Sequence, residues 1–303
     1  MMSRLKTMLL ALRERLADGI AEAALRSPGL ENRLRTLAPL LNGLRVFEGL
    51  QRRVIDRLVR GLPERGRECR WLKVGGINLL YDLSSDQAGR LHYFAGLPYE
   101  ADTTEFLLSH LPVGGTFADI GANHGYFTVA SALKVGPAGR VFSFEPNPAA
   151  TERLRRHMRL NGVEDRVTVI EVALSDVDGH TAEFFVGESA ETNVYGSLLP
   201  SEFALSQKWL DMLRKISVQT RTFDDWFTEV CPGRIDVMKI DVENAESLVL
   251  AGMVRTLRKA PPRAIICETE ADSKSSQLLT AHGYRPTCQR SRDTRNLFLV
   301  HEA

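Results

Sequence analysis

The sequence predicts an α/β fold in which helices cover both faces of a mainly parallel sheet, with a helical extension ahead of it. From residue 116 onward, short apolar segments alternate with segments of helical periodicity, which indicates parallel strands joined by crossover helices. A glycine-rich loop directly follows the first of these strands. The last two strands are joined by a loop, 289–295, that is too short for a crossover helix, so we expect them to pair antiparallel.

Seven short apolar segments predict the strands of this doubly wound sheet. They are Thr116–Ile120, Arg140–Glu145, Val167–Val172, Ile235–Asp241, Ala264–Glu268, Tyr284–Cys288 and Asn296–Val300. Helical periodicity predicts helices at Phe127–Lys134 and Ala149–Leu160 between the early strands. Upstream, residues 71–84 predict a β-hairpin that turns at a glycine pair, and a helix is expected at Thr103–Leu111.

Residues 1–66 predict a helical extension, and residues 67–303 the main domain. Leucines recur at helical spacing, first at Leu5, Leu9, Leu12 and Leu16, and residues 1–70 hold 15 Lys and Arg against 8 Asp and Glu. The apolar stripe requires cover from the main domain, from a second copy in a homodimer, or from a peripheral membrane surface. We favour the first two, because Glu14, Asp18 and Glu22 dilute the basic face.

Composition narrows the class of protein. The chain has 303 residues, 44% of them hydrophobic, and a formal net charge of +1, which gives no general argument for a nucleic-acid partner. Its 4 cysteines form no C-x-x-C pair, so a reducing, cytoplasmic setting is expected. No run approaches the roughly 18 apolar residues of a transmembrane segment. Arg13 and Arg15 interrupt the short apolar stretch near the N-terminus, which is therefore not interpreted as a signal peptide.

The strongest motif is the glycine loop that runs from Asp119 through Gly121, Asn123 and Gly125. Glycines let the backbone turn tightly and approach a ligand, and a helix N-terminus behind them favours a negative group. No G-K-[ST] follows, which excludes a phosphate-binding P-loop, and the glycine spacing differs from that of a dinucleotide site.

Two further strand ends lie where an adenosine-containing ligand would bind. Glu145 ends the second strand and can accept both hydroxyls of a ribose. Ala173 and Leu174 follow the third strand and can flank an adenine, whereas Asp176 is equally well explained as a turn residue.

A fourth segment brings carboxylates to the same edge of the sheet. Asp241 ends a strand beside the expected ligand site, and Glu243 and Glu246 follow it into the next helix. Acids are favoured at a helix start, which is an ordinary structural explanation for Glu246. Asp241, in contrast, has little structural reason to end a strand in a cleft.

Together these motifs resemble those of the FkbM family of methyltransferases over about residues 85–300. The chain carries the D-x-G-A-N-x-G-Y-x-T loop, the F-E-P-x-P strand end and the A-L-S-D segment, and it departs in the fourth segment, where Asn244 replaces a usual glycine. Asparagine tolerates a left-handed backbone, so we expect the loop to keep its shape.

The resemblance implies a Rossmann-like class I methyltransferase fold, S-adenosyl-L-methionine as cofactor, and methylation of a hydroxyl oxygen. It also implies that Glu145 binds the ribose, that Ala173 and Leu174 lie along the adenine, and that the methionine part is surrounded by Asp119, Gly121, Asn123 and Gly125. The acceptor would be a small molecule or glycan, such as a sugar, glycolipid or natural product.

Removing the hydroxyl proton requires a base. Asp241 is the leading candidate, followed by Glu243 and Glu268, and His124 in the glycine loop is a rival because it titrates near neutrality. The clustered carboxylates could instead hold a divalent ion, although the sequence assigns no metal ligand. Residues 186–217 are expected to form the acceptor pocket, with Asn193, Tyr195, Ser197 and Trp209, and Trp226 just beyond them. Aromatic faces suit sugar rings, but such rings are more often part of the core.

Three other functions fit the sequence less well. The glycine spacing disfavours a hydride-transferring dehydrogenase. A nucleic-acid methyltransferase would need a basic stripe, and only the N-terminal helices are basic. A non-catalytic protein that binds an adenosine ligand would have no need of the acids at 241 and 243.

Overall fold

The protein is described by a computed structural model, and its chain forms two compact units, Met1–Tyr99 and Glu100–Ala303. The predicted boundary at residue 66 stays a prediction. The described residues are 14–24, 26–27, 29–30, 33–34, 53–54, 57–58, 69–74, 77–82, 99–187, 196–199, 213–287 and 295–302.

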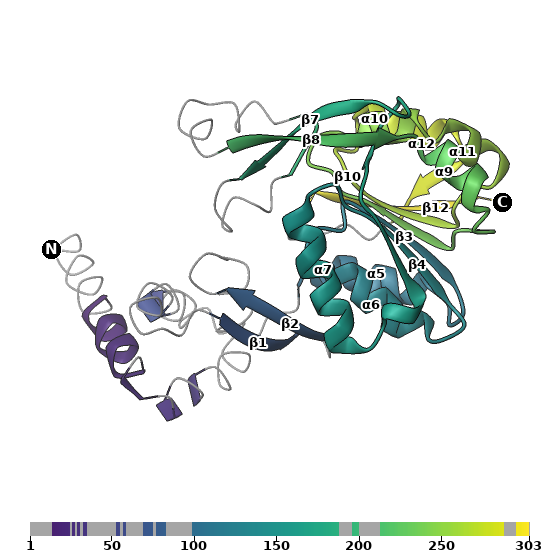
Figure 1. The fold of residues 1–303 in the computed structure, drawn as a ribbon. Coiled ribbons are helices and arrows are strands. Elements are labelled where there is room, and N and C mark those ends of the chain that lie inside the picture. The colour runs from purple at the N-terminus through teal and green to yellow at the C-terminus, as the bar shows by residue number, and fades with distance from the viewer. Residues whose placement is uncertain are drawn as a thin grey trace, which may run out of the picture. The chain divides into compact units, whose positions relative to one another are not determined.

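The second unit contains a seven-stranded sheet that confirms the predicted doubly wound α/β class (Figure 1). In spatial order its strands are β11 (Tyr284–Pro286), β12 (Asn296–His301), β10 (Ala264–Glu268), β9 (Val237–Ile240), β3 (Thr116–Ile120), β4 (Arg140–Phe144) and β5 (Val167–Ile170). The pairs from β5 to β10 are parallel, and β12 runs antiparallel to both β10 and β11. This confirms the prediction that the last two strands pair antiparallel.

Helices cover both faces of this sheet. Figure 1 shows α5 (Ala101–His110), α6 (Tyr126–Val135) and α7 (Pro148–Asn161) on one face. The other face carries α9 (Phe223–Val230), α10 (Glu246–Ala251), α11 (Val254–Lys259) and α12 (Lys274–Ala281). A 3-10 turn, Glu164–Arg166, precedes β5. The central strand β9 is buried at every residue, as expected for a parallel strand covered on both sides.

The strand order reverses between β3 and β9. The chain runs from β3 outward to β4 and β5 and then returns to the opposite side of β3 as β9. Ligands of doubly wound sheets bind outside the carboxyl ends of the strands at such a reversal. The glycine loop after β3 and the acids after β9 therefore meet at one place.

A second sheet in this unit was not predicted. It has three strands, ordered β6 (Ala173–Leu174), β8 (Leu213–Arg221) and β7 (Thr181–Gly187). β7 and β8 pair antiparallel along their lengths, and Phe184, Val186 and Val218 form the buried side of the pair. The expected acceptor insertion at 186–217 thus begins and ends within paired strands.

The first unit contains the predicted hairpin, with β1 (Cys69–Val74) antiparallel to β2 (Ile77–Asp82). Residues 14–24 are helical, as predicted, but their buried positions are Ala17, Ala21 and Ala24, and Leu16 is exposed. Within this single chain, Leu16 is therefore not covered, and cover of the stripe by a second copy or a membrane surface stays a prediction. Leu5, Leu9 and Leu12 lie outside the described residues.

Acids of this helix pair with arginines of residues 53–58. Glu14 pairs with Arg53, and Asp18 pairs with Arg57. Val54 and Leu58 are buried beside these arginines in the sequence. The two helical segments therefore lie side by side. The acids that reduce the positive charge of the first segment do so by forming ion pairs with these arginines. Within the described part of the chain, no helix is long and apolar enough to span a membrane.

Candidate active site

Close packing around the glycine loop leaves little room for side chains at its glycine positions. Gly121 has φ 81°, and a Cβ there would lie 1.8 Å from the carbonyl oxygen of Asp241. Gly125 has φ 84°, and a Cβ there would lie 2.1 Å from Cδ1 of Leu154. The backbone N–H groups of Gly121 and Ala122 both donate to the carbonyl oxygen of Phe144 at 3.0 Å. Glycine is therefore favoured at both positions by φ, and at position 121 it is also required by the contact with the backbone of Asp241.

Two polar atoms of this loop have no hydrogen-bond partner. Asp119 is 1% exposed, and its Oδ2 accepts from the Thr128 hydroxyl at 2.6 Å while its Oδ1 has no partner. The buried Oδ1 of Asn123 likewise has none. Burial raises the pKa of the Asp119 carboxyl. Since buried polar atoms are almost always hydrogen-bonded, these two oxygens mark a place for ligand groups.

Glu145 stands at the end of β4, as predicted, and is 6% exposed. Its two oxygens accept from the backbone N–H groups of Asn123 and Asn147, each at 2.8 Å. Burial raises the pKa of Glu145 to about 7, although these two hydrogen bonds oppose the shift. Each carboxylate oxygen has a second lone pair, so the group can still accept from a diol.

A pocket opens between these elements. Its walls include Gly121, Glu145, Ala173 and Leu174, which the sequence assigned to cofactor binding. The other lining residues are Ile120, Phe144, Pro146, Val172, Phe184, Gly196, Leu198, Val242 and Ala245. The pocket is therefore apolar with one carboxylate at its wall, a lining that suits a nucleoside.

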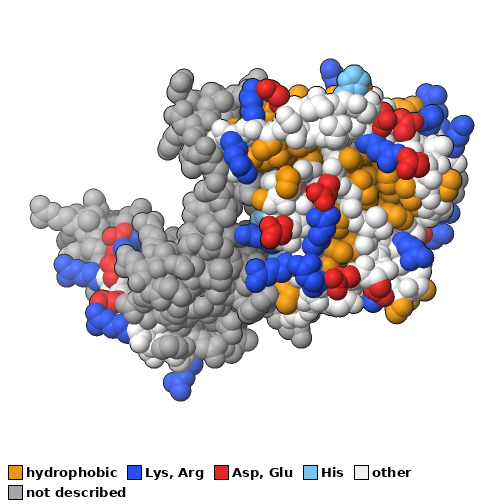
Figure 2. Space-filling view, in the orientation of Figure 1, with side chains coloured by type: hydrophobic (Ala, Val, Ile, Leu, Met, Phe, Trp, Pro, Cys, Tyr) orange, Lys and Arg blue, Asp and Glu red, His pale blue; other side chains and the backbone are white. Residues whose placement is uncertain are grey.

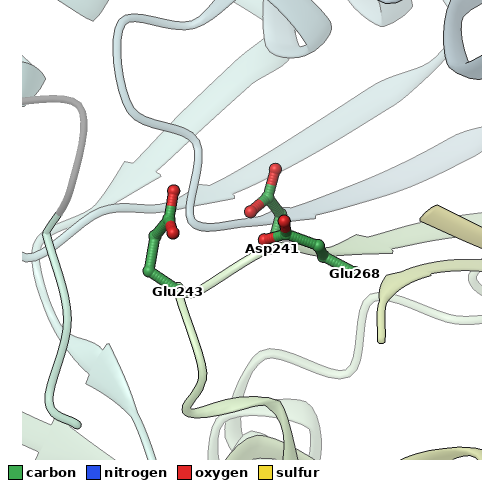
Figure 3. Close-up of side chains that lie close together, drawn as sticks. All are labelled: Asp241, Glu243 and Glu268. Carbon is green, nitrogen blue, oxygen red and sulfur yellow. The ribbon is translucent and has the colours of Figure 1, made fainter. Parts of the chain in front are cut away.

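Three carboxylates gather beside it. Asp241, Glu243 and Glu268 each have an oxygen within 4.8 Å of the others, and Figure 3 shows Asp241 and Glu268 next to each other with Glu243 facing them. Such oxygens are also the ligands that divalent cations prefer. The arrangement can therefore accept a proton or hold a cation.

The three carboxyl groups differ in their pKa. Burial opposes ionisation of Asp241, but the Lys239 ammonium and hydrogen bonds outweigh it and lower the pKa of that carboxyl. Burial and the charge of Asp241 raise the pKa of Glu243 to about 7 and that of Glu268 to about 9. A general base works best when its pKa is near the working pH, which favours Glu243.

Lys239 is a site residue that the sequence reasoning missed. It is 2% exposed, and its Nζ lies 2.5 Å from Oδ2 of Asp241 and 4.8 Å from the centre of the Phe127 ring. Burial alone would lower the pKa of its ammonium. The negative charges of Asp241, Glu100 and Asp119 outweigh burial and raise this pKa above its usual value, so Lys239 stays charged. A charged residue in the middle of the apolar segment 235–241 was the available signal.

The loop after β9 has an unusual backbone. Glu243 and Asn244 have φ of 54° and 81°, so two successive residues that are not glycine are left-handed. This confirms that Asn244 accommodates the conformation. Glu246 is 6% exposed, and its Oε1 accepts from the backbone N–H groups of Val242 and Asn244. Glu246 is therefore explained by its structural role.

His124 lies on the α7 side of the loop. Its ring nitrogens lie 3.2 and 3.4 Å from the Arg153 guanidinium, and its carbonyl oxygen is 2.6 Å from Nδ1 of His157. Burial, followed by the charge of Arg153, holds the pKa of His124 well below its usual value. A base role for His124 stays a prediction, and its surroundings favour it less than Glu243.

The expected acceptor residues divide into three groups. Ser197 is buried and contacts the loop after β9. Trp226 is 2% exposed and packs against Phe142, Phe144 and Phe223 in the core, which bears out the core alternative for this ring. Asn193, Tyr195 and Trp209 lie outside the described residues.

The comparison with protein families decides the class. A family model described as the methyltransferase FkbM domain matches residues 119–286, which include the glycine loop, Glu145 and the three carboxylates. The chain belongs to the FkbM methyltransferase family. The methyltransferase has the class I sheet that the sequence predicted, with its antiparallel last strands.

The methyltransferase also resembles individual proteins. It is 38% identical over 146 residues to 2-O-methyltransferase NoeI of Sinorhizobium fredii, a match covering 46% of this chain and 58% of that protein. It is 27% identical over 198 residues to methyltransferase sdnD of Sordaria araneosa, covering 55% of this chain and 74% of that one. The match thus spans little more than half of NoeI.

Solved structures resemble the methyltransferase only weakly. A SAM-dependent O-methyltransferase from Thermotoga maritima aligns with a TM-score of 0.35 and 13% identity, covering 68% of this chain and 66% of that one. A likeness of this size carries no argument, and the fold rests on the sheet itself.

The cofactor of this family is S-adenosylmethionine. The pocket fits it, because a buried carboxylate at the end of β4 suits a ribose and an apolar wall suits an adenine. The unpartnered oxygens of Asp119 and Asn123 are acceptors beside the loop, as an ammonium group would need.

Proposed function

We propose that this methyltransferase transfers a methyl group to a hydroxyl oxygen of a sugar, glycolipid or natural product. The observation that carries the proposal is the group of carboxylates at the ends of β9 and β10, beside the cofactor pocket. A hydroxyl is a poor nucleophile until its proton is removed, and these carboxylates can accept it. The similarity to a 2-O-methyltransferase supports the same reaction.

The cofactor residues follow from the pocket. In this proposal Glu145 accepts hydrogen bonds from the ribose, and Ala173 and Leu174 contact the adenine. The methionine part lies against the glycine loop, at Asp119, Gly121, Asn123 and Gly125. When bound, the cofactor supplies the methyl group as an electrophilic sulfonium carbon.

Asp241 and Glu243 share the work on the acceptor. Lys239 holds Asp241 in place and keeps it ionised, so that Asp241 can orient the hydroxyl. Glu243 has a pKa close to neutrality, so it can take the proton. The methyltransferase would thus align the acceptor with one acid and deprotonate it with the other.

The proposal includes a cellular compartment and a kind of acceptor. The reaction takes place in the cytoplasm, where the thiols of Cys231 and Cys267 stay reduced. Figure 2 shows Lys and Arg side chains interspersed with Asp and Glu, and the described ion pairs include Arg155–Glu171 and Arg221–Glu229. This alternation favours a small acceptor over a nucleic acid, which prefers a basic stripe.

The proposal is tested by measuring cofactor consumption over glycans, glycolipid precursors and polyketides. We expect Asp241→Asn and Glu243→Gln to lower kcat by about 10²–10⁴-fold, while the Kd of S-adenosylhomocysteine stays within about threefold. The matched control is Asp176→Asn, because Asp176 is an exposed acid after β6 that accepts only from Ser175 among the bonds described. It should leave kcat unchanged.

Two outcomes would contradict these roles. Full activity in both acid variants would remove them from the chemical step, and turnover of amines without turnover of hydroxyls would replace O-methylation by N-methylation. Loss of activity with chelator, restored by a divalent ion, would show that the carboxylates act by holding a metal.

A further inference from the structure

Residues 196–199 form a described segment between β7 and β8 that lies against the active site. Ser197 makes an antiparallel bridge with Phe185 of β7, through Phe185 N–H to Ser197 O at 2.9 Å and Ser197 N–H to Phe185 O at 3.1 Å. These two bonds attach the segment to the small sheet. Its position is therefore set by the backbone of β7.

The Ser197 hydroxyl joins this segment to the loop after β9. Its Oγ lies 2.5 Å from the carbonyl oxygen of Glu243 and 3.1 Å from that of Val242. It also accepts from the backbone N–H of Leu199 at 3.0 Å. A hydroxyl has a single hydrogen to donate, and the shortest distance assigns it to Glu243.

Ser197 contacts the part of the loop whose backbone conformation is least favourable. Glu243 and Asn244 are both left-handed, a conformation that side chains other than glycine adopt only when their surroundings impose it. Glu246 holds the N–H groups of Val242 and Asn244 from one side. Ser197 donates to the carbonyl oxygen of Glu243, lies 3.1 Å from that of Val242, and is 3% exposed.

The neighbours of Ser197 belong to the pocket wall. Gly196 and Leu198 line the pocket together with Val242. A Cβ at Gly196 would lie 2.8 Å from the ring of Phe184, so the segment packs closely on β7. Ser197 itself faces the loop, because its hydroxyl is bonded to backbone atoms there.

We propose that Ser197 is a positioning residue that fixes the backbone of Glu243, and so the place from which its carboxylate reaches the acceptor hydroxyl. The inference rests on the proposed function, since it assigns to Glu243 the removal of that proton. Ser197 is not among the residues that line the described pocket, and in this proposal it acts through Glu243. The small sheet is thereby coupled to the chemical step through one hydroxyl group.

The experiment compares Ser197→Ala with Ser197→Thr in the full chain, on the acceptor found in the panel. We expect Ser197→Ala to lower kcat on the order of a hundredfold, because a small displacement of a reacting group has effects of that size. KM for the acceptor and Kd for S-adenosylhomocysteine should stay within about threefold. Ser197→Thr keeps the hydroxyl and should recover most of kcat.

Ser131→Ala is the matched control, because Ser131 in α6 is fully buried and its Oγ has no hydrogen-bond partner. It removes a buried hydroxyl without touching the loop and should leave kcat unchanged. When Glu243→Gln is already present, adding Ser197→Ala should lower kcat by less than about threefold, because both substitutions remove the same function.

The outcomes separate this inference from the proposed function. Unchanged kcat in Ser197→Ala, a Thr variant as impaired as the Ala variant, or full additivity with Glu243→Gln would overturn the role of Ser197. A loss of cofactor affinity as large as the loss of kcat would do so too, and would make the segment part of the cofactor site. Full activity in Glu243→Gln alone would instead overturn the proposed base, and the inference with it.

Discussion

At the scale of single residues, the raised pKa of Glu145 has consequences that can be measured. Its pKa is raised from 4.5 to about 7, chiefly by burial. A raised carboxyl pKa means that the folded protein prefers the protonated form, so the contribution of Glu145 to stability is present below about pH 4.5 and is lost as the pH rises toward about 7. Accepting hydrogen bonds from a ribose requires the opposite, ionised form.

Binding of S-adenosylhomocysteine should therefore strengthen as the pH rises. Between about pH 6 and about pH 8 we expect its Kd to fall by about tenfold, because the ionised fraction of Glu145 rises by that factor. Calorimetry at several pH values measures this, and buffers of different ionisation enthalpy detect the proton released. Glu145→Gln should bind more weakly and lose this pH dependence. An unchanged dependence in that variant would assign the titration to another group.

Individual residues also show where sequence reasoning succeeds. Asn244 was expected to be left-handed, and it is, because this preference belongs to the residue itself. For Trp226, only the fold decides between acceptor pocket and core, because it packs Phe144 beside the ring. Lys239 was missed although a charged residue within an apolar strand was a signal, because its role depends on Asp241, which the fold places beside it.

At the scale of elements, the sheet was predictable and the small sheet was not. β3 and β10 occur at their predicted residues because parallel strands buried on both faces are short apolar runs. β7 and β8 have one buried and one exposed side, and the segment between them interrupts the hairpin pattern. A pair of strands so far apart in sequence leaves no local turn signal to predict it.

The glycine loop gives a prediction at this scale. Gly121→Ala should destabilise the protein by about 3 kcal/mol or more and abolish binding of S-adenosylhomocysteine, because the new methyl group would push the loops after β3 and β9 apart. Gly162→Ala is the matched control, since Gly162 has φ 62° and nothing within 4 Å of its Cβ position. It should cost only about 1–2 kcal/mol, from φ alone.

Chemical denaturation and calorimetry measure both quantities. Equal effects of the two substitutions would show that the backbone conformation, and not the contact with Asp241, requires glycine at position 121.

At the scale of the whole molecule, the described pocket falls in one of the two units. Every described residue that lines the cofactor pocket belongs to the unit Glu100–Ala303. The helical residues of the first unit cover part of their own apolar surface, with Ala17, Ala21 and Leu58 buried and their acids paired to arginines. We therefore propose that residues 1–66 mediate association, with the rest of the chain or with a second copy.

Deleting residues 1–66 should leave the Kd of S-adenosylhomocysteine within about threefold, because none of the described residues that line the pocket is removed. Calorimetry on the shortened chain measures this, with circular dichroism to establish that it folds and sedimentation to compare the mass of the two forms. A folded, shortened chain that no longer binds would show that the helices build the site. Salt-sensitive flotation of the full chain with anionic vesicles, lost on deletion, would instead favour the membrane-surface role.

The buried ammonium of Lys239 has a consequence for how this protein can change over time. Removing Lys239 alone would leave Asp241, whose side chain is 24% exposed, without the buried ammonium that keeps it ionised, a change that costs up to about 3–5 kcal/mol. Removing Asp241 alone would cost less, because the negative charges of Glu100 and Asp119 still act on the ammonium. A variant that loses either charge is therefore less stable, and a matching change at the other position restores part of that stability. We expect new acceptor specificities in such a protein to arise first in the loops around the pocket, while these two positions change together or stay as they are.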